Sequence, residues 1–329
     1  MTSRDIVVVG ASAGGVEALR AMVGGLPAGL RAAVLVVLHV PRDAPSALPR
    51  ILSRSGPLPA RTAFEGEPLT AGRIYVAPPG LHMLMLDHRI RLSHGPAENG
   101  HRPAIDPLFR SAARTAGPRV IAVVLSGSRD DGAVGAETVA ASGGIVVVQR
   151  PEDALNQSMP RAVMARVEPD YQSDAADLGP LLAALTETKI PDPPELPADP
   201  LTDAEVAIGG LAAITTDQIT DNPPVYGCPT CGGGLFELEN WPEPRYRCRV
   251  GHAWSPESLI DEQAVATEGA LWTALRALEE KSALNRRLAE QHRLDRGRFI
   301  RMAEDAEGAG ELIRGLLTRI AAVSTIPAE

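Results

Sequence analysis

Asp5-Ile6-Val7-Val8-Val9-Gly10-Ala11-Ser12-Ala13-Gly14-Gly15-Val16 is the stretch that decides the fold. The β-branched run Ile6–Val9 predicts a buried strand, and a helical pattern begins at Val16. Ser12 then lies at the apex of the turn between them, an order typical of a nucleophile elbow. Backbone N–H groups of Ala13 and Gly14, at the positive end of the helix, could stabilise an oxyanion beside Ser12.

Glycine turns of other kinds also follow a first strand in α/β proteins. The glycines at 10, 14 and 15 do not fit the GxGxxG dinucleotide fingerprint, and no GK[ST] follows as in a Walker loop. A non-catalytic glycine turn remains an open alternative, so the partners of Ser12 must decide.

Composition limits the class of protein. The 329 residues suffice for one sizeable α/β domain and something smaller. A formal net charge of -9 argues against a nucleic-acid binder. No apolar run reaches membrane-spanning length, since the run 34–40 is interrupted by His39 and followed by Pro41, so membrane insertion is not expected. The chain enters its first strand without a signal peptide, which predicts a cytoplasmic protein.

From residue 4 to about 186, apolar strand patterns alternate with helical ones, which predicts a doubly wound α/β fold with a mostly parallel sheet and helices on both faces. The expected strands are Ile6–Val9, Ala33–Leu38, Arg73–Val76, Val120–Leu125 and Gly144–Val148. Helices are expected near 16–24, 45–54, 105–115 and 133–141, and a local hairpin arm at Leu84–Leu92.

Three of these strands end in chemically useful side chains: Ser12, His39 and the segment that contains Asp131. Carboxyl ends of parallel strands meet at one edge, where a serine, a base and an orienting carboxylate could form a triad. His39 could equally be a core histidine, and Asp131 could simply cap the helix after Gly132.

Several blocks resemble, in order and spacing, the bacterial chemotaxis protein-glutamate methylesterase effector domain, the CheB type. The resemblance covers about residues 4–185. The blocks are Gly10–Gly15, Leu38–Pro41, Ala77–Met83, Gly100–Ser111, Leu125–Gly127 with Asp131–Gly135, and Met159–Pro160.

The resemblance implies a serine hydrolase that removes methyl esters from glutamate side chains of methylated chemoreceptor-type helical proteins, with glutamine deamidation as a second activity. It implies Ser12 as nucleophile, His39 as general base and Asp131 as the orienting carboxylate, with no cofactor for catalysis. The order Ser, His, Asp differs from that of α/β-hydrolases.

Two departures from the family pattern affect these expectations. Ser126-Gly127-Ser128-Arg129 stands where the family usually has Thr-Gly-Met-Gly, so the backbone N–H of Ser128 would complete the oxyanion hole and Arg129 could change the loop. The neighbouring Asp130 leaves the acid uncertain by one position. No stretch resembles the N-terminal receiver that controls the chemotaxis enzyme, so either the esterase is constitutively open or another element controls the site.

Basic residues on one loop could bind substrate. Arg102, Arg110 and Arg114 could steer an acidic receptor helix toward the site. A solvated face beside a helix that starts near Asp106 explains these charges equally well.

The chain after 186 changes character. We predict a catalytic domain at 1–186, an acidic Pro-rich linker at 187–222, a metal-binding module at 223–256 and a helical region at 257–329. Every cysteine lies between 228 and 248, so a disulfide framework is not expected.

The cysteine spacing predicts a zinc-ribbon-like module. Cys228-Pro229-Thr230-Cys231 precedes, by sixteen residues, Cys248-Arg249-Val250-Gly251-His252. Three thiolates and one imidazole would fill the tetrahedral shell of a structural zinc, leaving no open position for catalysis. An unmetallated loop and a redox CxxC pair are the alternatives.

Beyond Ser255 or Ser258, which are plausible helix caps, the sequence reads as helix. One stripe is formed by Leu271, Leu275, Leu278, Leu284 and Leu288. A second segment is expected after Gly308 and Gly310. The pattern favours a helical hairpin or a dimerisation arm. A dimerisation arm would join two copies of the chain into a homo-oligomer.

Two functions follow as hypotheses. The first is a stand-alone methylesterase with a regulatory extension. The second is a binding protein of the same fold that recognises receptor or kinase helices and has lost turnover through the Ser128-Arg129 change.

Overall fold

The computed structural model describes residues 2–41, 46–191, 203, 206–207, 223–224, 226–238, 244–292 and 294–324. They form two compact units, residues 1–259 and 260–329, which are described separately. Most of the predicted Pro-rich linker lies outside the described residues.

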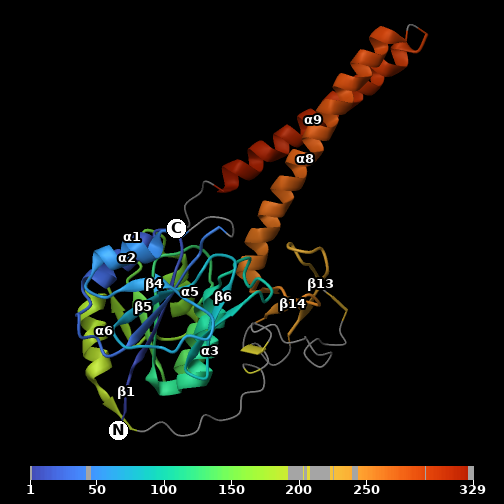
Figure 1. The fold of residues 1–329 in the computed structure, drawn as a ribbon. Helices are drawn as coiled ribbons and strands as arrows, with labels where there is room; N and C mark the ends of the chain where they lie inside the picture. Colours follow the sequence, from blue (N-terminus) through green and yellow to red (C-terminus); the bar gives the residue numbers. More distant parts are fainter. Residues whose placement is uncertain are drawn as a thin grey trace. The chain divides into compact units, whose positions relative to one another are not determined.

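A seven-stranded sheet forms the centre of the first unit (Figure 1). Its neighbouring strands all pair in parallel. In spatial order the strands are β10 (Tyr171–Ser173), β9 (Ile145–Gln149), β8 (Val120–Val124), β2 (Ile6–Ala11), β3 (Ala33–Leu38), β5 (Arg73–Val76) and β4 (Ala60–Thr62). The central strands β2, β3 and β8 are buried along their whole length, because both faces of the sheet are covered.

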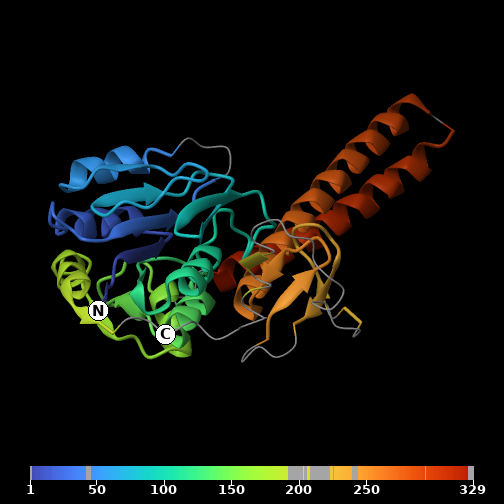
Figure 2. The same cartoon turned by 60° about the horizontal axis from the view of Figure 1, so that its bottom comes forward.

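Helices cover the two faces of the sheet (Figures 1 and 2). The first face carries α1 (Gly15–Gly24), α2 (Leu48–Ser55) and α6 (Leu178–Glu187). The second carries α3 (Ile105–Ala116), α4 (Ala133–Ala141), α5 (Ser158–Arg166) and the hairpin β6 (His82–Leu86) with β7 (Arg89–Ser93). The predicted doubly wound fold is confirmed.

The sheet also fixes the place of the site. The chain runs from β2 to β3 on one side, and later returns to β8 on the other side of β2. Such a reversal opens a crevice at the carboxyl ends of the strands, where ligands bind in open α/β sheets.

The predicted elements of this unit are found with small shifts at their ends. Strand β2 continues to Ala11, and α2 begins at Leu48 rather than near 45. The short strands β4, β10, β1 (Thr2–Ser3) and β11 (Lys189–Ile190), the 3-10 turn Gly117–Arg119, and the helices α5 and α6 were not predicted. The four strands were missed because two or three residues are too few for a period-two pattern to be recognised.

The cysteine-containing module is a four-stranded antiparallel sheet in the same unit. Its strands are β12 (Tyr226–Gly227), β13 (Gly234–Glu237), β14 (Tyr246–Cys248) and β15 (Ala253–Trp254). Its small core contains Leu235, Tyr246, Trp254 and Leu259 together with Cys228 and Cys248.

Two long helices, α8 (Pro256–Gln291) and α9 (Arg296–Ser324), follow. They lie side by side as a hairpin in both ribbon views (Figures 1 and 2), and Glu307 of α9 accepts hydrogen bonds from Ser282 and Arg286 of α8. The Ser255 hydroxyl accepts a hydrogen bond from Ser258 N–H at 3.1 Å, which confirms the helix cap.

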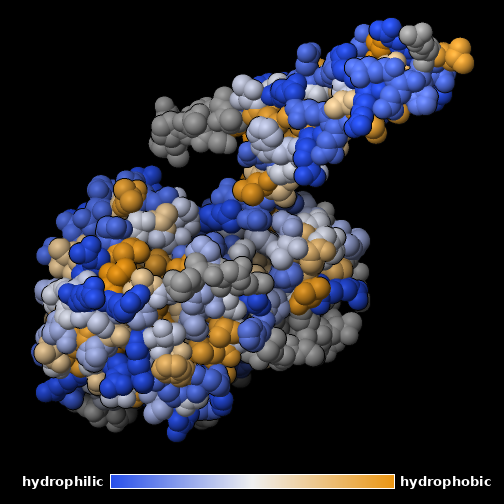
Figure 3. Space-filling view, turned by 45° about the horizontal axis from the view of Figure 1, so that its top comes forward, coloured by the Kyte–Doolittle hydropathy of each residue, from blue (hydrophilic) through white to orange (hydrophobic). Residues whose placement is uncertain are grey.

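Two expectations for this region were wrong. The second helix begins at Arg296 and runs through Gly308 and Gly310, because packing against α8 offsets the low helix propensity of glycine. Leu284 is 59% exposed and lies off the packed stripe, where Ser282, Asn285 and Ala289 are buried instead. The visible face of this hairpin is mostly hydrophilic, with scattered apolar side chains (Figure 3).

No helix among the described residues is long and apolar enough to cross a membrane.

Candidate active site and metal cluster

Ser12 lies in the turn between β2 and α1. Its N–H donates to Ser126 O at 2.9 Å, and its carbonyl accepts from Gly15 N–H at 2.9 Å. Gly14 precedes the helix with φ 75°, a left-handed conformation that favours glycine. The turn therefore holds Ser12 at the start of a helix and against the loop that follows β8.

The structure brings Ser12, His39 and Asp131 together. His39 Nδ1 lies 3.1 Å from Ser12 Oγ, and His39 Nε2 lies 2.7 Å from Asp131 Oδ2. The His39 and Asp131 side chains are 6% and 1% exposed. With Nε2 protonated toward the carboxylate, Nδ1 is left as an acceptor for the serine proton.

Asp131 is held by the first N–H groups of helix α3. Its Oδ2 accepts from Ile105 N–H at 2.6 Å and its Oδ1 from Asp106 N–H at 3.3 Å. Burial alone would raise the pKa of Asp131, but the hydrogen bonds from His39 and Ile105 and the charge of His39 keep that pKa well below its usual range. The acid is therefore ionised beside His39.

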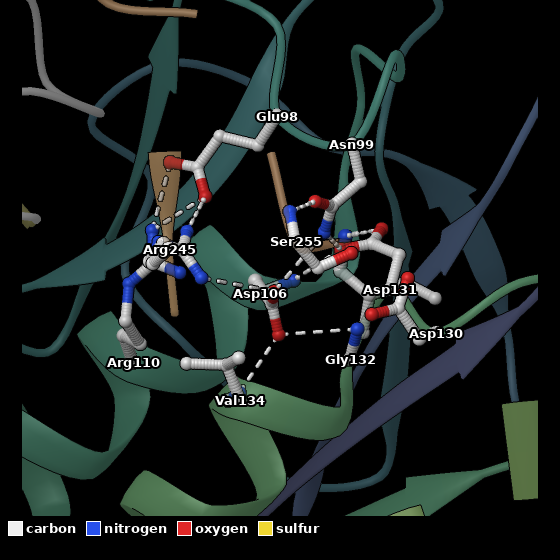
Figure 4. Close-up of polar contacts among 12 residues, drawn as sticks. Glu98, Asn99, Asp106, Arg110, Asp130, Asp131, Gly132, Val134, Arg245 and Ser255 are labelled. Carbon is white, nitrogen blue, oxygen red and sulfur yellow. Dashed lines mark hydrogen bonds and ion pairs between the residues drawn. The ribbon is translucent and has the colours of Figure 1, made fainter. Parts of the chain in front are cut away.

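Helix α3 returns the same kind of contact to helix α4. Asp106 Oδ1 accepts from Gly132 N–H at 3.1 Å (Figure 4). It also accepts from Gly135 N–H at 2.7 Å. The two aspartates thus cap each other's neighbouring helix, which fixes the position of Asp131 from both sides. The sequence alternative that Asp131 caps its own helix is not what the structure shows.

The structure separates the roles of the two adjacent acids. Asp131 contacts His39, whereas Asp130 Oδ1 accepts from Ser258 Oγ at 2.5 Å. The geometry therefore favours Asp131 as the acid of the triad.

The loop after β8 keeps the backbone expected of a glycine at position 129. Arg129 has φ 64°, so the arginine adopts the left-handed conformation rather than changing it. A Cβ on Gly127 would come within 1.9 Å of Met159 Sδ and 2.9 Å of Ser12 Cβ. Ser128 Oγ accepts from Asn156 Nδ2 at 2.9 Å. This loop therefore packs directly against the nucleophile.

The three predicted steering arginines have different surroundings. Arg102 donates to the carbonyls of His94 and Gly95 at 2.7 and 2.8 Å, and Arg114 pairs with Asp203. Arg110 is fully buried and donates to both carboxylate oxygens of Glu98 at 2.8 Å. Arg110 therefore belongs to neither a steering surface nor a solvated face, since its charge is neutralised in the interior.

Sequence reasoning missed a tight turn beside the triad, the Glu98–His101 turn. Its central residues Asn99 and Gly100 have φ 51° and 80°, and Glu98 and His101 exchange backbone hydrogen bonds. Two positive φ values define a type I′ turn, for which Asn-Gly is the usual sequence. The Asn-Gly pair was the available signal.

Side chains of this turn reach the triad. Asn99 Nδ2 donates to Asp131 Oδ1 at 3.2 Å, and the His101 ring stacks on the His39 ring at 3.6 Å between centroids. Burial and the neighbouring His39 lower the pKa of His101 to about 3, so His101 is neutral.

A buried arginine of the cysteine-containing module was also missed. Arg245 donates to Glu98 Oε2 at 2.8 Å, and its Nη1 lies 3.8 Å from Asp106 Oδ2 (Figure 4). Burial opposes ionisation of Glu98, yet the guanidiniums of Arg110 and Arg245 lower its pKa to about 2. Burial and the nearby Asp131 charge raise the pKa of Asp106 to about 7. No sequence pattern indicates this pairing across 147 residues.

The four predicted metal ligands form one cluster. The ligand atoms of Cys228, Cys231, Cys248 and His252 all lie within 4.8 Å of one another. Cys231 Sγ is 3.7 Å from Cys248 Sγ, and His252 Nδ1 is 3.5 Å from Cys248 Sγ and 3.8 Å from Cys228 Sγ. A tetrahedron with zinc–sulfur bonds of about 2.3 Å has edges of about 3.8 Å. The cluster therefore fits a tetrahedral metal ion of zinc size.

Comparisons with known proteins agree with this geometry. The family model described as CheB methylesterase matches residues 7–182. A protein-glutamate methylesterase/protein-glutamine glutaminase of Methanosarcina mazei is 36% identical over 176 residues, which is 51% of this chain and 48% of that protein. One from Myxococcus xanthus is 35% identical over 187 residues, 56% of this chain and 53% of that protein.

A solved structure extends the comparison to the fold. The CheB methylesterase catalytic domain of Thermotoga maritima is matched over its whole length and 56% of this chain, with 30% identity and a TM-score of 0.54. The chain spans about half the length of the curated relatives it matches. The family model covers more than half of the chain, and the chain belongs to the CheB methylesterase family.

Proposed function

We propose that this protein is a protein-glutamate methylesterase that hydrolyses methyl esters on the glutamate side chains of helical, chemoreceptor-type proteins. The observation that carries the proposal is the hydrogen-bonded sequence Ser12, His39, Asp131 at the carboxyl edge of the sheet. The relatives named as methylesterases support the substrate class. The cytoplasmic location expected from the sequence stays a prediction.

The reaction follows from the positions of these atoms. His39 Nδ1 accepts the proton of Ser12 Oγ, and the oxygen attacks the ester carbonyl. Asp131 keeps Nε2 protonated and stabilises the imidazolium that forms. His39 then donates its proton to the departing methoxide, which leaves as methanol. A water molecule, deprotonated by His39, attacks the acyl-enzyme carbonyl, the bond to Ser12 Oγ breaks with return of the proton from His39 to that oxygen, and glutamate is released.

The oxyanion formed in both steps needs donors beside Ser12. We assign this role to backbone N–H groups of Ala13, Gly14 and Ser128, which flank the nucleophile on its two neighbouring loops. Gly127 N–H donates to Asn156 O at 3.1 Å and is not among them. Arg102 stays a prediction as a substrate-binding residue. The same steps with an amide substrate would give glutamine deamidation and release ammonia.

The cysteine and histidine cluster is proposed to hold a structural zinc ion. Three thiolates and one imidazole complete a tetrahedral shell, so the ion would order the module and leave catalysis to Ser12. Metal analysis of the purified protein, with a Cys248→Ser variant as control, would test this assignment. A homo-oligomer formed through the α8–α9 hairpin also stays a prediction, which the molar mass in solution would test.

Mass spectrometry of a methylated receptor incubated with wild type and with Ser12→Ala tests the activity. We expect methyl loss with the first and none with the second, and equal loss would refute the assignment. The alternative, a binding protein without turnover, is distinguished by a serine-directed phosphonate. The phosphonate should label Ser12 if the protein is an active esterase. Absence of labelling in a folded protein would favour the binding protein.

A further inference from the structure

The cysteine-containing module is hydrogen bonded to the Glu98–His101 turn. Ala253 O accepts from Asn99 N–H at 2.9 Å, and Ala253 N–H donates to Ala97 O at 3.3 Å. Ala253 directly follows His252, a member of the metal cluster. The backbone next to the metal cluster is therefore also the backbone that pairs with the turn beside the triad.

The side chain of Asn99 continues this connection to the catalytic acid (Figure 4). Its Oδ1 accepts from Ser255 N–H at 3.1 Å, while its Nδ2 donates to Asp131 Oδ1 at 3.2 Å and to Asp106 Oδ2 at 3.3 Å. If the amide were flipped, its oxygen would lie against the carboxylates of Asp131 and Asp106 and its nitrogen against Ser255 N–H. Neither the contact with ionised Asp131 nor that with Ser255 could be a hydrogen bond, so the surroundings determine the amide orientation. Asn99 is 1% exposed.

Buried charges from helix α3 and from the cysteine-containing module hold the first residue of the turn, Glu98. Glu98 accepts hydrogen bonds from Arg110 of α3 and from Arg245 of the module, and all three side chains are 3% exposed or less. At the other end of the turn, His101 stacks on His39. The module thus contacts the turn at Glu98 and Asn99, and the turn contacts two members of the triad.

We propose that the module is a positioning element of the esterase, which acts through Asn99 to hold the Asp131 carboxylate in line with His39. The side-chain hydrogen bonds of Asn99 go to Ser255, Asp106 and Asp131 rather than to Ser12, so it is a positioning residue rather than a catalytic one. Ordering of the metal cluster would keep Ala253 and Ser255 in place, and loss of the metal would release Asn99. This inference rests on the proposed function for its kinetic consequences, but its structural consequences do not depend on turnover.

An Asn99→Gly variant tests the link on the side of the triad. Glycine keeps the left-handed backbone of the turn and removes only the amide. Loss of a partner that orients a metal ligand typically costs about tenfold to a hundredfold in affinity or activity, and we expect a loss of the same order for a partner that orients a catalytic acid. We expect such a fall in kcat with KM nearly unchanged, and we expect the downfield proton NMR signal of His39 Nε2–H to shift. A purely structural role of Asn99 would lower thermal stability without moving this signal.

A matched pair of variants tests the link on the side of the module. Arg245→Met removes the buried charge at Glu98, and Arg249→Met removes an exposed charge of the same module. In Arg245→Met we expect faster hydrogen exchange of the Asn99 backbone N–H and slower phosphonate labelling of Ser12. In Arg249→Met we expect neither change. Zinc content checks that both modules still form.

Metal removal completes the test. Chelation of wild type should slow Ser12 labelling by a factor similar to that of Asn99→Gly, and added Zn²⁺ should restore it. In Asn99→Gly, where the link is already cut, chelation should change the labelling rate much less. Chelation that changes neither the His39 signal nor Asn99 exchange would overturn the inference. A wild-type protein that shows both responses but removes no methyl groups would refute only the proposed esterase function.

Discussion

The sheet that carries Ser12 and the module that carries the metal cluster hold polar side chains by different means. The sheet is buried between two large apolar clusters, so hydrophobic packing is the main interaction that places its strands. Among its described residues, the core of the module comprises six side chains, of which Cys228 and Cys248 are themselves members of the metal cluster. We infer that the sheet forms its site without a metal ion, whereas the proposed metal ion helps the module to fold.

The largest expected effect follows directly from this difference. Removal of zinc should unfold the module and leave the sheet intact, because structural zinc contributes on the order of 10 kcal/mol to such small modules. Hydrogen exchange followed by peptide mass spectrometry would compare β13 and β14 with β2 and β3. Cys231→Ser should weaken zinc binding, with the exposed neighbour Thr230→Ser as control. Equal protection of the module with and without metal would contradict the comparison.

The second effect concerns the sheet edge, where adjacent acids offer a matched pair. Asp131→Asn should lower kcat about 10⁴-fold, because the amide no longer favours the protonated Nε2 of His39. Asp130→Asn keeps an acceptor for Ser258 and should change kcat by less than about tenfold. Both variants should retain the same folded sheet. If Asp130→Asn had the larger effect, the assigned acid would be wrong.

A third test concerns the buried acid between the two regions. The pKa of Asp106 is raised from its ordinary 3.8 to about 7 by burial and by Asp131, against Arg110 and Arg245, with Glu98 also nearby. Between these values the folded protein keeps a proton that the unfolded chain has lost. Its contribution to the free energy of unfolding therefore falls as pH rises from about 4 to about 7, by a few kcal/mol.

Denaturant unfolding at a series of pH values would measure this slope. The Asp106→Asn variant cannot lose the proton, so the difference between wild type and variant should follow the same range. A constant difference over that range would show that Asp106 is ionised throughout.

The features that could be predicted from the sequence are those that depend on local patterns. Continuous apolar runs predicted five of the seven parallel strands, with Ser12 and His39 directly after two of them and Asp131 in the loop that follows a third. The spacing of Cys228, Cys231, Cys248 and His252 predicted the cluster. In both cases chain geometry limits where the side chains can go.

Long-range pairings could not be predicted in this way. Arg245 and Glu98 are separated by 147 residues, and either could have been a surface charge. The start of α9 could not be predicted for the same reason, because tertiary packing against α8 decides where it begins, rather than the low helix propensity of glycine.

The smallest expected effect is at Arg129, where this sequence departs from the glycine of the family pattern. Arg129→Gly removes the strain of a left-handed non-glycine residue but makes the unfolded chain more flexible, so stability should change by less than about 1 kcal/mol. Arg129→Ala loses the same side chain and keeps the strain, so it should be about 1 kcal/mol less stable than Arg129→Gly. Because the loop already has the backbone that glycine would adopt, the position of Ser128 N–H and the value of kcat should change only a few-fold. A gain in kcat of more than about tenfold in both variants would instead show that the arginine side chain obstructs the site, which would support the binding-protein alternative.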